Sequence, residues 1–321
     1  MNLNKKNLKK IKGDASFRLF FRNTTNNKNS IIVYAKRERR KNLLIYDCIN
    51  KLLINNKIIA PKLYAENYRK NYIEIEDFGD DSFYKLLKRN KSNKIKLFKD
   101  IIILLDKIQK IKKRKFKNFS NNYYQIPIYS KKKLFEESAL FCDWYIPKVI
   151  REDKVLFLNR KLKEQIKKLL SKIKQKNDTF VHRDFHASNL IKYKNKTAII
   201  DSQDACIGNI AYDLASLIDD VRFKSSVKLK KSLYKYFFKL KKNDINKFSF
   251  ENDFEILSIL RNLKIIGIFT RLSLRDKKSI YLKLIPHAWK LIELRLSNKP
   301  LFKDLKNLLD VNFPKKIRIR K

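Results

Sequence analysis

The feature that most constrains the fold of this chain is a change in its hydrophobic pattern near Gly79. Before Gly79, short apolar runs bounded by polar, turn-forming residues alternate with one segment whose apolar residues recur at helical spacing. The expected order is strand, strand, helix, strand, strand, at residues 17–21, 31–35, 41–55, 63–65 and 72–75. This order predicts a small antiparallel sheet that carries one helix.

After Gly79 the hydrophobic spacing is mostly helical. Helices are expected at residues 81–90, 94–112, 131–148, 159–174, 211–222, 226–241, 251–273 and 278–296. The basic run at residues 110–117 is expected to be a solvated helix end or loop. We therefore predict an α+β fold with an N-lobe over residues 1–79 and a larger, mostly helical C-lobe over residues 80–321.

The net charge of +45 raises the question of nucleic-acid binding. The lysines are spread along the whole chain instead of forming one stripe, and the chain is rich in Lys, Asn, Ile, Phe and Tyr but holds 4 Gly and 6 Pro. An A+T-rich genome produces this bias, because those residues have A/T-rich codons. The charge therefore does not predict a nucleic-acid partner.

The location expected from the sequence is the cytosol. The three cysteines, Cys48, Cys142 and Cys206, are widely spaced without a CxxC pair, which is typical of buried thiols in a reducing compartment. No apolar run approaches the length of a membrane span, and residues 1–12 are basic without the apolar stretch of a secretory signal. The sequence does not indicate an oligomeric state.

Polar side chains gather at both ends of a predicted hairpin. Two short apolar strands, at residues 190–193 and 197–200, flank a two-residue polar turn. Asp184 and Asn189 precede the first strand, and Asp201 follows the second. Turn formation alone accounts for each of these residues singly, but it does not select their offsets.

These offsets fit phosphoryl transfer. One carboxylate must orient the attacking hydroxyl and accept its proton, while an amide oxygen and a second carboxylate hold Mg²⁺ against the ATP phosphates. The kinase catalytic loop H-R-D-x-x-x-x-N is present, since His182, Arg183 and Asp184 are followed five residues later by Asn189. We therefore predict an ATP- and Mg²⁺-dependent kinase with Asp184 as the catalytic residue and Asn189 and Asp201 as metal ligands.

Two other motifs near these residues are excluded. His182 and His186 are spaced for a zinc site on a helix, but the glutamate of HExxH is absent and no cysteine is near, so both are expected to brace the catalytic loop. The Asp-Phe-Gly triplet at residues 77–79 precedes the catalytic loop and so cannot supply the metal ligand that follows it in kinases.

The catalytic loop resembles that of the aminoglycoside phosphotransferase/choline kinase family, and Asp213 matches the acidic residue at the start of that family's Tyr-Asp-Leu-Ala helix. The chain is most similar to the bacterial N-acetylmuramate/N-acetylglucosamine anomeric kinases of cell-wall recycling. The similar segments are residues 13–18, 20–22, 75–80, 140–146, 201–205 and 263–271. The first and last of them distinguish this subgroup from other phosphotransferases.

The resemblance implies a two-lobed protein-kinase-like fold that binds ATP. The nucleotide contacts that it implies are Ser16 and Arg18 near the phosphates and the backbone of Glu76 to Phe78, as the hinge between the lobes, against adenine. Lys36 resembles the phosphate-binding lysine of kinases, with Arg18 or Arg22 as the alternatives. Asp213 would brace the catalytic loop. Ser202 departs from the family, which usually has phenylalanine after the metal-binding aspartate.

The resemblance also implies an acceptor site for an amino sugar. Its implied residues are Gln203, Asp204, Glu137, Asp143 and Trp144, although Trp144 also fits a core position of a helix and Asp204 a solvated loop. The implied reaction is phosphorylation of the anomeric hydroxyl of N-acetylmuramate or N-acetylglucosamine. A choline, amino-alcohol or aminoglycoside kinase and an inactive kinase-like nucleic-acid-binding protein remain alternatives.

Overall fold

The computed structural model describes residues 8–11, 18–24, 29–89, 94–297 and 299–319. Contacts divide the chain into two compact units, each described by itself below. The first unit comprises residues 1–127 and 180–207, and the second comprises residues 128–179 and 208–321. The predicted lobe border near residue 79 is a different division, and it stays a prediction.

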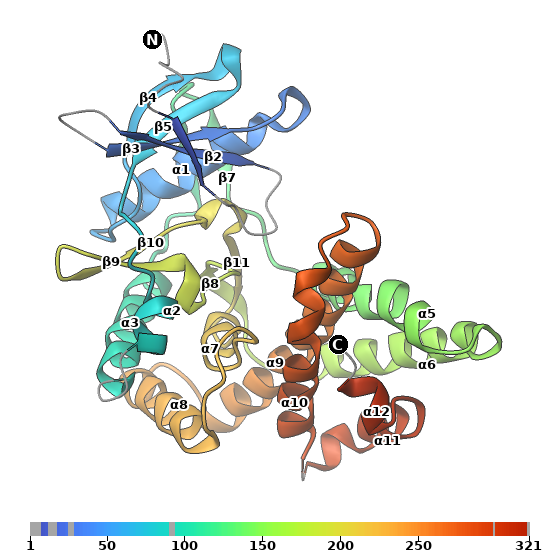
Figure 1. The fold of residues 1–321 in the computed structure, drawn as a ribbon. Helices are drawn as coiled ribbons and strands as arrows, with labels where there is room; N and C mark the ends of the chain where they lie inside the picture. The colour runs from blue at the N-terminus through green and yellow to red at the C-terminus, as the bar shows by residue number, and fades with distance from the viewer. Residues whose placement is uncertain (1–7, 12–17, 25–28, 90–93, 298, 320–321) are drawn as a thin grey trace. The chain divides into compact units, whose positions relative to one another are not determined.

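A five-stranded antiparallel sheet forms the centre of the first unit (Figure 1). Its strands are β1 (Leu8–Ile11), β2 (Leu19–Thr24), β3 (Asn29–Tyr34), β4 (Leu63–Asn67) and β5 (Tyr72–Glu76), in the order β1-β2-β3-β5-β4. Val33 of β3 pairs with Ile73 of β5, and both are buried against Leu43 and Tyr46 of helix α1 (Lys41–Asn55). The predicted strand, strand, helix, strand, strand order is confirmed, with one further strand, β1, before it.

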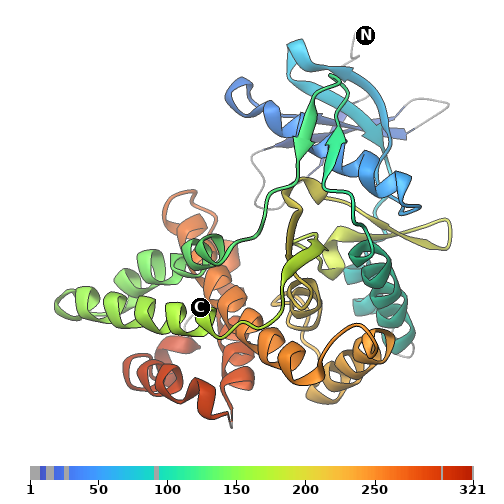
Figure 2. The ribbon, with the colours of Figure 1, turned by 180° about the vertical axis from the view of Figure 1, so that it is seen from behind.

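A short ribbon lies over α1. β6 (Lys115–Lys117) pairs with β7 (Tyr123–Gln125), and β6 contacts α1, as Figure 2 shows from behind. The Cys48 thiol of α1 reaches the Phe116 carbonyl at 3.3 Å. The prediction of a solvated helix end or loop at residues 110–117 is therefore wrong for its last three residues, which are held in the ribbon.

The remaining elements of the first unit are the predicted hairpin, formed by β9 and β10, and the segments near it. They are α2 (Phe83–Arg89), α3 (Lys94–Gln109), the end of β8 (Asn177–Val181), β9 (Leu190–Tyr193), β10 (Lys196–Ile199) and the start of β11 (Cys206–Asn209). Lys194 and Asn195 both have positive φ, 45° and 58°, as a tight two-residue hairpin turn requires. The hairpin is confirmed, and it is tied to the chain by hydrogen bonds from Lys192 N to Asp81 O and from Ile199 N to Ile59 O, both 2.9 Å.

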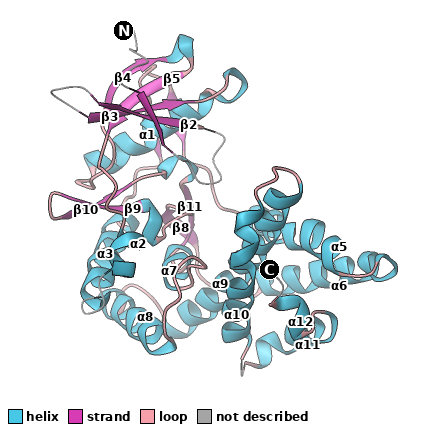
Figure 3. Cartoon of the chain, viewed as in Figure 1, coloured by secondary structure: helices cyan, strands magenta, loops and turns pink. Residues whose placement is uncertain are grey.

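The described part of the second unit is almost wholly helical (Figure 3). Its elements are α4 (Lys131–Ser138), the π-helical turn η4 (Phe141–Tyr145), α5 (Ile146–Val149), α6 (Glu152–Ser171), α7 (Tyr212–Ile218), α8 (Val227–Lys241), α9 (Lys247–Leu274), α10 (Ile285–Leu296), α11 (Lys303–Asn312) and α12 (Lys315–Arg318). The predicted α+β fold is confirmed by this unit and by the antiparallel sheet. The last two helices, α11 and α12, were not predicted.

Helix α9 is the centre of the second unit and packs closely on η4. A side-chain carbon added at Gly267 would lie 2.3 Å from the Leu140 carbonyl carbon. Only glycine allows the two backbones to approach this closely. The segments at residues 140–146 and 263–271 are therefore in direct contact.

A buried ionic cluster joins three helices of the second unit. Asp219 is fully buried, and its carboxylate accepts hydrogen bonds from Arg295 Nε at 2.8 Å, Lys230 Nζ at 3.0 Å and Ser258 Oγ at 2.6 Å. Burial alone would raise the pKa of Asp219, but the two cations and the hydroxyl outweigh it and hold the pKa at about 2.

We expect this cluster to make stability depend on pH. The folded pKa lies below the unfolded value of 3.8, so the contribution of Asp219 is present above pH 4 and lost as the pH falls towards 2. The shift corresponds to about 2 kcal/mol, of which about half is lost at pH 3. Urea unfolding at pH 6 and pH 3 should show a smaller difference between wild type and Asp219→Asn at pH 3. A constant difference would contradict the assignment.

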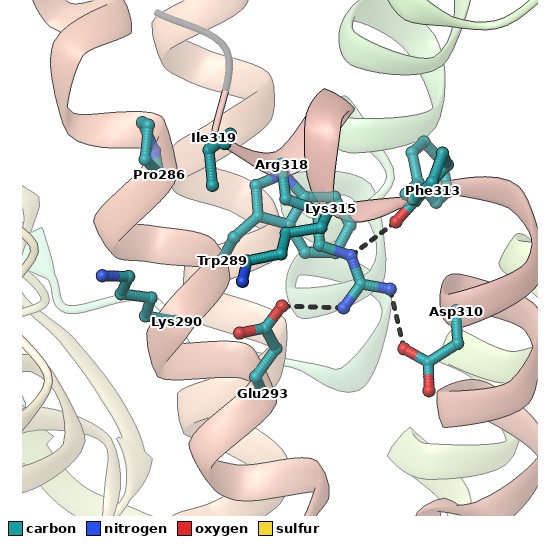
Figure 4. A pocket seen from close by; sticks show the side chains of 10 residues that line it. Pro286, Trp289, Lys290, Glu293, Asp310, Phe313, Lys315, Arg318 and Ile319 are labelled. Carbon is teal, nitrogen blue, oxygen red and sulfur yellow. Dashed lines mark hydrogen bonds and ion pairs between the residues drawn. The ribbon is translucent and has the colours of Figure 1, made fainter.

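A cavity of about 300 Å³ lies near the C-terminus of the described chain (Figure 4). Arg318 closes one side of it, donating to Glu293 and Asp310, each at 2.7 Å, and stacking 4.9 Å above the Trp289 ring. The cavity therefore lies beside the contacts through which Arg318 attaches α12 to α10 and α11. None of the predicted site residues lines it.

Across the residues that the structure describes, none of the helices is both long enough and apolar enough for a membrane span. The cytosolic location stays a prediction.

Candidate active site

The catalytic loop is closed by hydrogen bonds within the first unit. His186 N donates to Asp184 O at 3.0 Å, Asn189 N donates to His186 O at 2.9 Å, and the Asn189 Nδ2 amide donates to Asp184 O at 3.0 Å. Ile200 N, at the exit of the hairpin, donates to Asn189 O at 3.0 Å. These bonds bring the entry and exit of the hairpin together, as the sequence predicts for Asp184, Asn189 and Asp201.

The two loop histidines are buried. His182 is fully buried, and its Nε2 lies 3.2 Å from the Ile200 carbonyl, so its ring links the catalytic loop to the end of the hairpin. Burial lowers the pKa of His182, and the nearby Asp184 and Asp201 oppose this only in part. A neutral imidazole in this place suits a brace, the role predicted for His182. His186 is 5% exposed and holds the loop through its backbone.

Asp201 has an unusual backbone conformation. Its φ of 64° and ψ of 39° lie in the left-handed region, which aspartate tolerates better than most residues. The side chain is 38% exposed, and Oδ1 accepts a hydrogen bond from Arg18 Nη2 at 2.6 Å. The carboxylate is therefore fixed at one oxygen and open to solvent.

Arg18 is the buried cation of this site. It is 4% exposed, donates to Gln203 Oε1 at 2.8 Å as well as to Asp201, and lies over the Phe20 and Tyr46 rings at 5.5 and 5.4 Å. Two aromatic faces and two acceptors hold the guanidinium in one place.

The other two cation candidates lie in different surroundings. Lys36 is exposed, and its ammonium meets no carboxylate among the residues that the structure describes. Arg22 donates to Asp77 at 2.5 Å and to Asp80 at 2.9 Å, and these hydrogen bonds raise its pKa and lower that of Asp80. Arg22 therefore ties β2 to the segment after β5, and Arg18 is the candidate beside Asp201, the predicted metal ligand.

A kinase-type lysine pairs with a carboxylate of the helix that follows it, and the two acidic residues near Lys36 in the sequence, Glu38 and Asp47, do not pair with it. Asp47 forms an ion pair with Lys51 at 2.9 Å, and Glu38 is exposed. Helix α1 thus supplies no carboxylate for a kinase-type lysine, within the described ranges.

Helix α1 instead presents Tyr46 and Asn50 to the residues after the hairpin. Ser202 is fully buried, and its hydroxyl donates to Asn50 Oδ1 at 2.6 Å. The Tyr46 hydroxyl hydrogen-bonds to Asn50 and to the Asp201 backbone, and burial raises the pKa of Tyr46 to about 12. The serine that stands where the family usually has phenylalanine therefore makes a buried polar contact directly after Asp201.

We expect this contact to control the metal-binding carboxylate. Ser202→Ala and Asn50→Ala each leave one buried polar group without its partner, at a cost of about 1–3 kcal/mol. Each variant should therefore need about tenfold more Mg²⁺ for half-maximal activity, and the double variant should lose much less than the sum. Titration of Mg²⁺ in an activity assay measures this, with the exposed Ser171→Ala as the matched control. Additive losses would show that the two side chains act separately.

The predicted hinge packs on the hairpin. Phe78 is 8% exposed, and its ring lies 4.7 Å from that of Tyr193, whose hydroxyl donates to Glu76 Oε1 at 3.2 Å. Glu76 N donates to Lys62 O at 2.9 Å. Any backbone donor of this segment that binds a base must therefore belong to residue 77 or 78. The predicted phosphate contact Ser16 lies outside the described residues.

Two of the predicted acceptor-site residues lie in the first unit. Gln203 Nε2 donates to Asp204 Oδ2 at 2.8 Å, and Arg183 Nη1 lies 3.9 Å from Asp204 Oδ1. The Asp204 side chain is 51% exposed, as expected of a loop carboxylate. Arg18, Gln203 and Asp204 thus form one chain of hydrogen bonds beside Asp201.

The other predicted acceptor residues and Asp213 lie in the second unit. Glu137 is 8% exposed and accepts from Tyr129 at 2.5 Å and from Lys264 at 2.6 Å. Asp143 is exposed and pairs with Lys163 at 2.8 Å. Trp144 is partly exposed on η4. Asp213 is fully buried in the first turn of α7. Their predicted roles stay predictions.

The residues present fit a magnesium nucleotide. In the described part of the chain, no group of three or more His, Cys, Asp or Glu side chains could hold a metal ion. Mg²⁺ in kinases needs fewer protein ligands, because the phosphates supply the others. Asn189 donates through its amide nitrogen to Asp184 O, which leaves its oxygen for a cation, and the half-exposed Asp201 offers a carboxylate. Asn50 and Ser202 were not identified from the sequence, although the departure at Ser202 was noted.

Comparison with known proteins gives one family. The model of the family described as "Phosphotransferase enzyme family" matches residues 7–238. The N-acetylmuramate/N-acetylglucosamine kinase of Neisseria meningitidis serogroup B is 26% identical over 281 residues, which cover 85% of this chain and 80% of that protein.

Solved structures show the same fold at low identity. The choline kinase of Cryptosporidium parvum Iowa II superposes with a TM-score of 0.62 at 12% identity, covering 97% of this chain and 94% of that one. Amicoumacin kinase, solved in complex with AMP-PNP, Ca²⁺ and Ami, gives a TM-score of 0.61 at 12% identity, with coverage of 91% and 90%. The predicted resemblance and the protein-kinase-like fold are confirmed.

Proposed function

The chain belongs to the phosphotransferase enzyme family, and we propose that it uses ATP and Mg²⁺ to phosphorylate the anomeric hydroxyl of an amino sugar, N-acetylmuramate or N-acetylglucosamine. The single observation that supports the proposal is the set of hydrogen bonds that ties Asp184 to Asn189, and Asn189 to Ile200, the residue before Asp201. The sugar is supported by the name of the Neisseria relative.

Asp184 would act as the catalytic residue. Its carboxylate orients the anomeric hydroxyl of the sugar and accepts its proton. A bond forms between that oxygen and the γ-phosphorus of ATP, the bond from the γ-phosphorus to the bridging oxygen breaks, and ADP leaves with the electron pair. The hydrogen bonds from His186 N and from the Asn189 side-chain amide to Asp184 O hold the loop in place.

Asn189 and Asp201 would hold Mg²⁺, which neutralises the charge on the phosphates when it is bound. Arg18, whose guanidinium is held beside Asp201, would place its positive charge near the phosphate oxygens. The backbone of residues 77–78 would bind adenine. Amicoumacin kinase supports ATP use, because it was solved with an ATP analogue and a divalent cation.

The acceptor would be held by Gln203, Asp204, Glu137, Asp143 and Trp144. Sugars are bound by planar amides and carboxylates, with an aromatic face against the ring. Asp213 would support the catalytic loop.

An acceptor panel tests the proposal. Purified protein is incubated with ATP, Mg²⁺ and, separately, N-acetylmuramate, N-acetylglucosamine, choline, ethanolamine and an aminoglycoside. We expect NMR to show phosphate at C1 of one or both sugars. Turnover of choline or an aminoglycoside without either sugar would contradict the substrate. Absence of any thermal shift with Mg-ATP, together with salt-sensitive RNA binding, would favour the inactive nucleic-acid-binding alternative.

A further inference from the structure

Arg261 is a buried cation that forms no ion pair with the residues that the structure describes. It lies within α9, it is 5% exposed, and its Nη1 is buried with no hydrogen-bond partner among the described residues. No carboxylate of the described chain lies within ion-pair distance of it. A buried charge without a partner is costly, so folded proteins pair such groups or use them to bind a ligand.

A second cation lies one helical turn further along α9. Lys264 is three residues after Arg261, which places the two side chains about 60° apart around the helix and about 4.5 Å apart along it. Lys264 is 13% exposed, and its ammonium is neutralised by Glu137 Oε2 at 2.6 Å. The pair therefore keeps one positive charge in excess, and it is the charge on Arg261.

The polar side chains around Lys264 form an ordered network. Glu137 also accepts a hydrogen bond from Tyr129, whose hydroxyl lies 3.1 Å from that of Tyr212, and the two tyrosine rings meet edge to face at 4.9 Å. Tyr129, Glu137 and Tyr212 are all buried. This network fixes Lys264 and gives a rigid neighbour to Arg261.

The position of Arg261 in the chain points to the acceptor rather than to the nucleotide. The residues proposed for ATP and Mg²⁺ belong to the first unit, whereas Glu137, Asp143 and Trp144, proposed for the acceptor, belong to the second, as does α9. Lys264 touches Glu137 directly.

We propose that Arg261, with Lys264 beside it, is the subsite for a carboxylate on the acceptor sugar, and that the preferred acceptor is therefore an acidic amino sugar. This inference rests on the proposed function. N-acetylmuramate is N-acetylglucosamine with a lactyl ether, and it carries the carboxylate that its parent sugar lacks. A guanidinium binds a carboxylate with two parallel hydrogen bonds.

The test compares Arg261→Met and Arg261→Lys with Arg275→Met, which removes an exposed arginine at the C-terminal end of the same helix. We expect Arg261→Met to lower kcat/KM for N-acetylmuramate about 10- to 100-fold and that for N-acetylglucosamine less than threefold. Arg261→Lys should recover part of the loss, Arg275→Met should change neither value, and KM for ATP should stay constant. Equal losses on both sugars, or a rise in KM for ATP, would overturn the inference.

Thermal unfolding without ATP separates this inference from the proposed function. Removal of the uncompensated charge should raise the Tm of ligand-free Arg261→Met above that of wild type. N-acetylmuramate should raise the Tm of wild type but not of the variant. If the sugar binds in this way but is not phosphorylated, the proposed function fails and the subsite stands. If both sugars are phosphorylated equally well by Arg261→Met, the subsite fails and the function stands.

Discussion

Asp184→Asn is expected to lower kcat about 10³- to 10⁴-fold and to leave KM for ATP within about threefold of wild type. The amide has the size of the carboxylate but cannot accept the proton of the attacking hydroxyl. The fold of the loop should survive, because the bonds that close it run to the Asp184 backbone carbonyl, from His186 N and Asn189 Nδ2. Initial rates of ADP release with the best acceptor of the panel measure the effect.

The matched control is Asp178→Asn. Asp178 is an exposed aspartate on β8, six residues before Asp184, and the same substitution there should leave kcat unchanged. Equal thermal unfolding of the two variants would show that the loss is chemical. A kcat of Asp184→Asn within fivefold of wild type would exclude Asp184 as the base.

The sequence predicted the parts of the site that depend on spacing along the chain. The offset from Asp184 to Asn189 and the tight turn at Lys194 and Asn195 are local, because a five-residue loop and a two-residue hairpin leave few conformations. The order of strands and helix along the chain was predicted for a similar reason, because the hydrophobic spacing of each segment is local.

Contacts between distant parts of the chain could not be predicted in this way. Asn50 and Ser202 are 152 residues apart and meet only because α1 packs on the turn after the hairpin. Arg18 and Asp201 are 183 residues apart. The sequence did not identify Arg261, because an arginine without an ion pair is unusual only where it is buried, and burial is known only from the structure.

The short ribbon of β6 and β7 was missed for another reason. Its first strand alternates lysine and phenylalanine, Lys115, Phe116 and Lys117, so only one side chain faces α1 and the segment is as basic as an exposed loop. In a chain with 77 Lys and Arg, basic character carries little information about exposure.

Because the chain is rich in lysine, the sequence alone did not decide whether Lys36, Arg18 or Arg22 binds the phosphates. The structure now suggests a direct test. Arg18→Ala should lower kcat/KM for Mg-ATP about 10²- to 10³-fold, because removing one preorganised donor from developing phosphate charge costs about 2.7–4 kcal/mol. Lys36→Ala should change it less than about threefold, since the Lys36 side chain is exposed and has no ion pair among the described residues. Steady-state kinetics with varied Mg-ATP compare the two variants directly.

The variant Arg18→Lys tests whether the role of Arg18 depends on its positive charge alone or also on the planar shape of its guanidinium. A lysine keeps the positive charge, but it cannot reach Gln203 and Asp201 at once with a planar fork, as the guanidinium does at 2.8 and 2.6 Å. We therefore expect it to recover only about tenfold of the loss. Because Arg18 also holds Asp201, the alanine variant should need more Mg²⁺ for half-maximal activity, whereas Lys36→Ala should not. A large loss in Lys36→Ala with Arg18→Ala near wild type would return the role to the lysine at the end of β3, as in protein kinases.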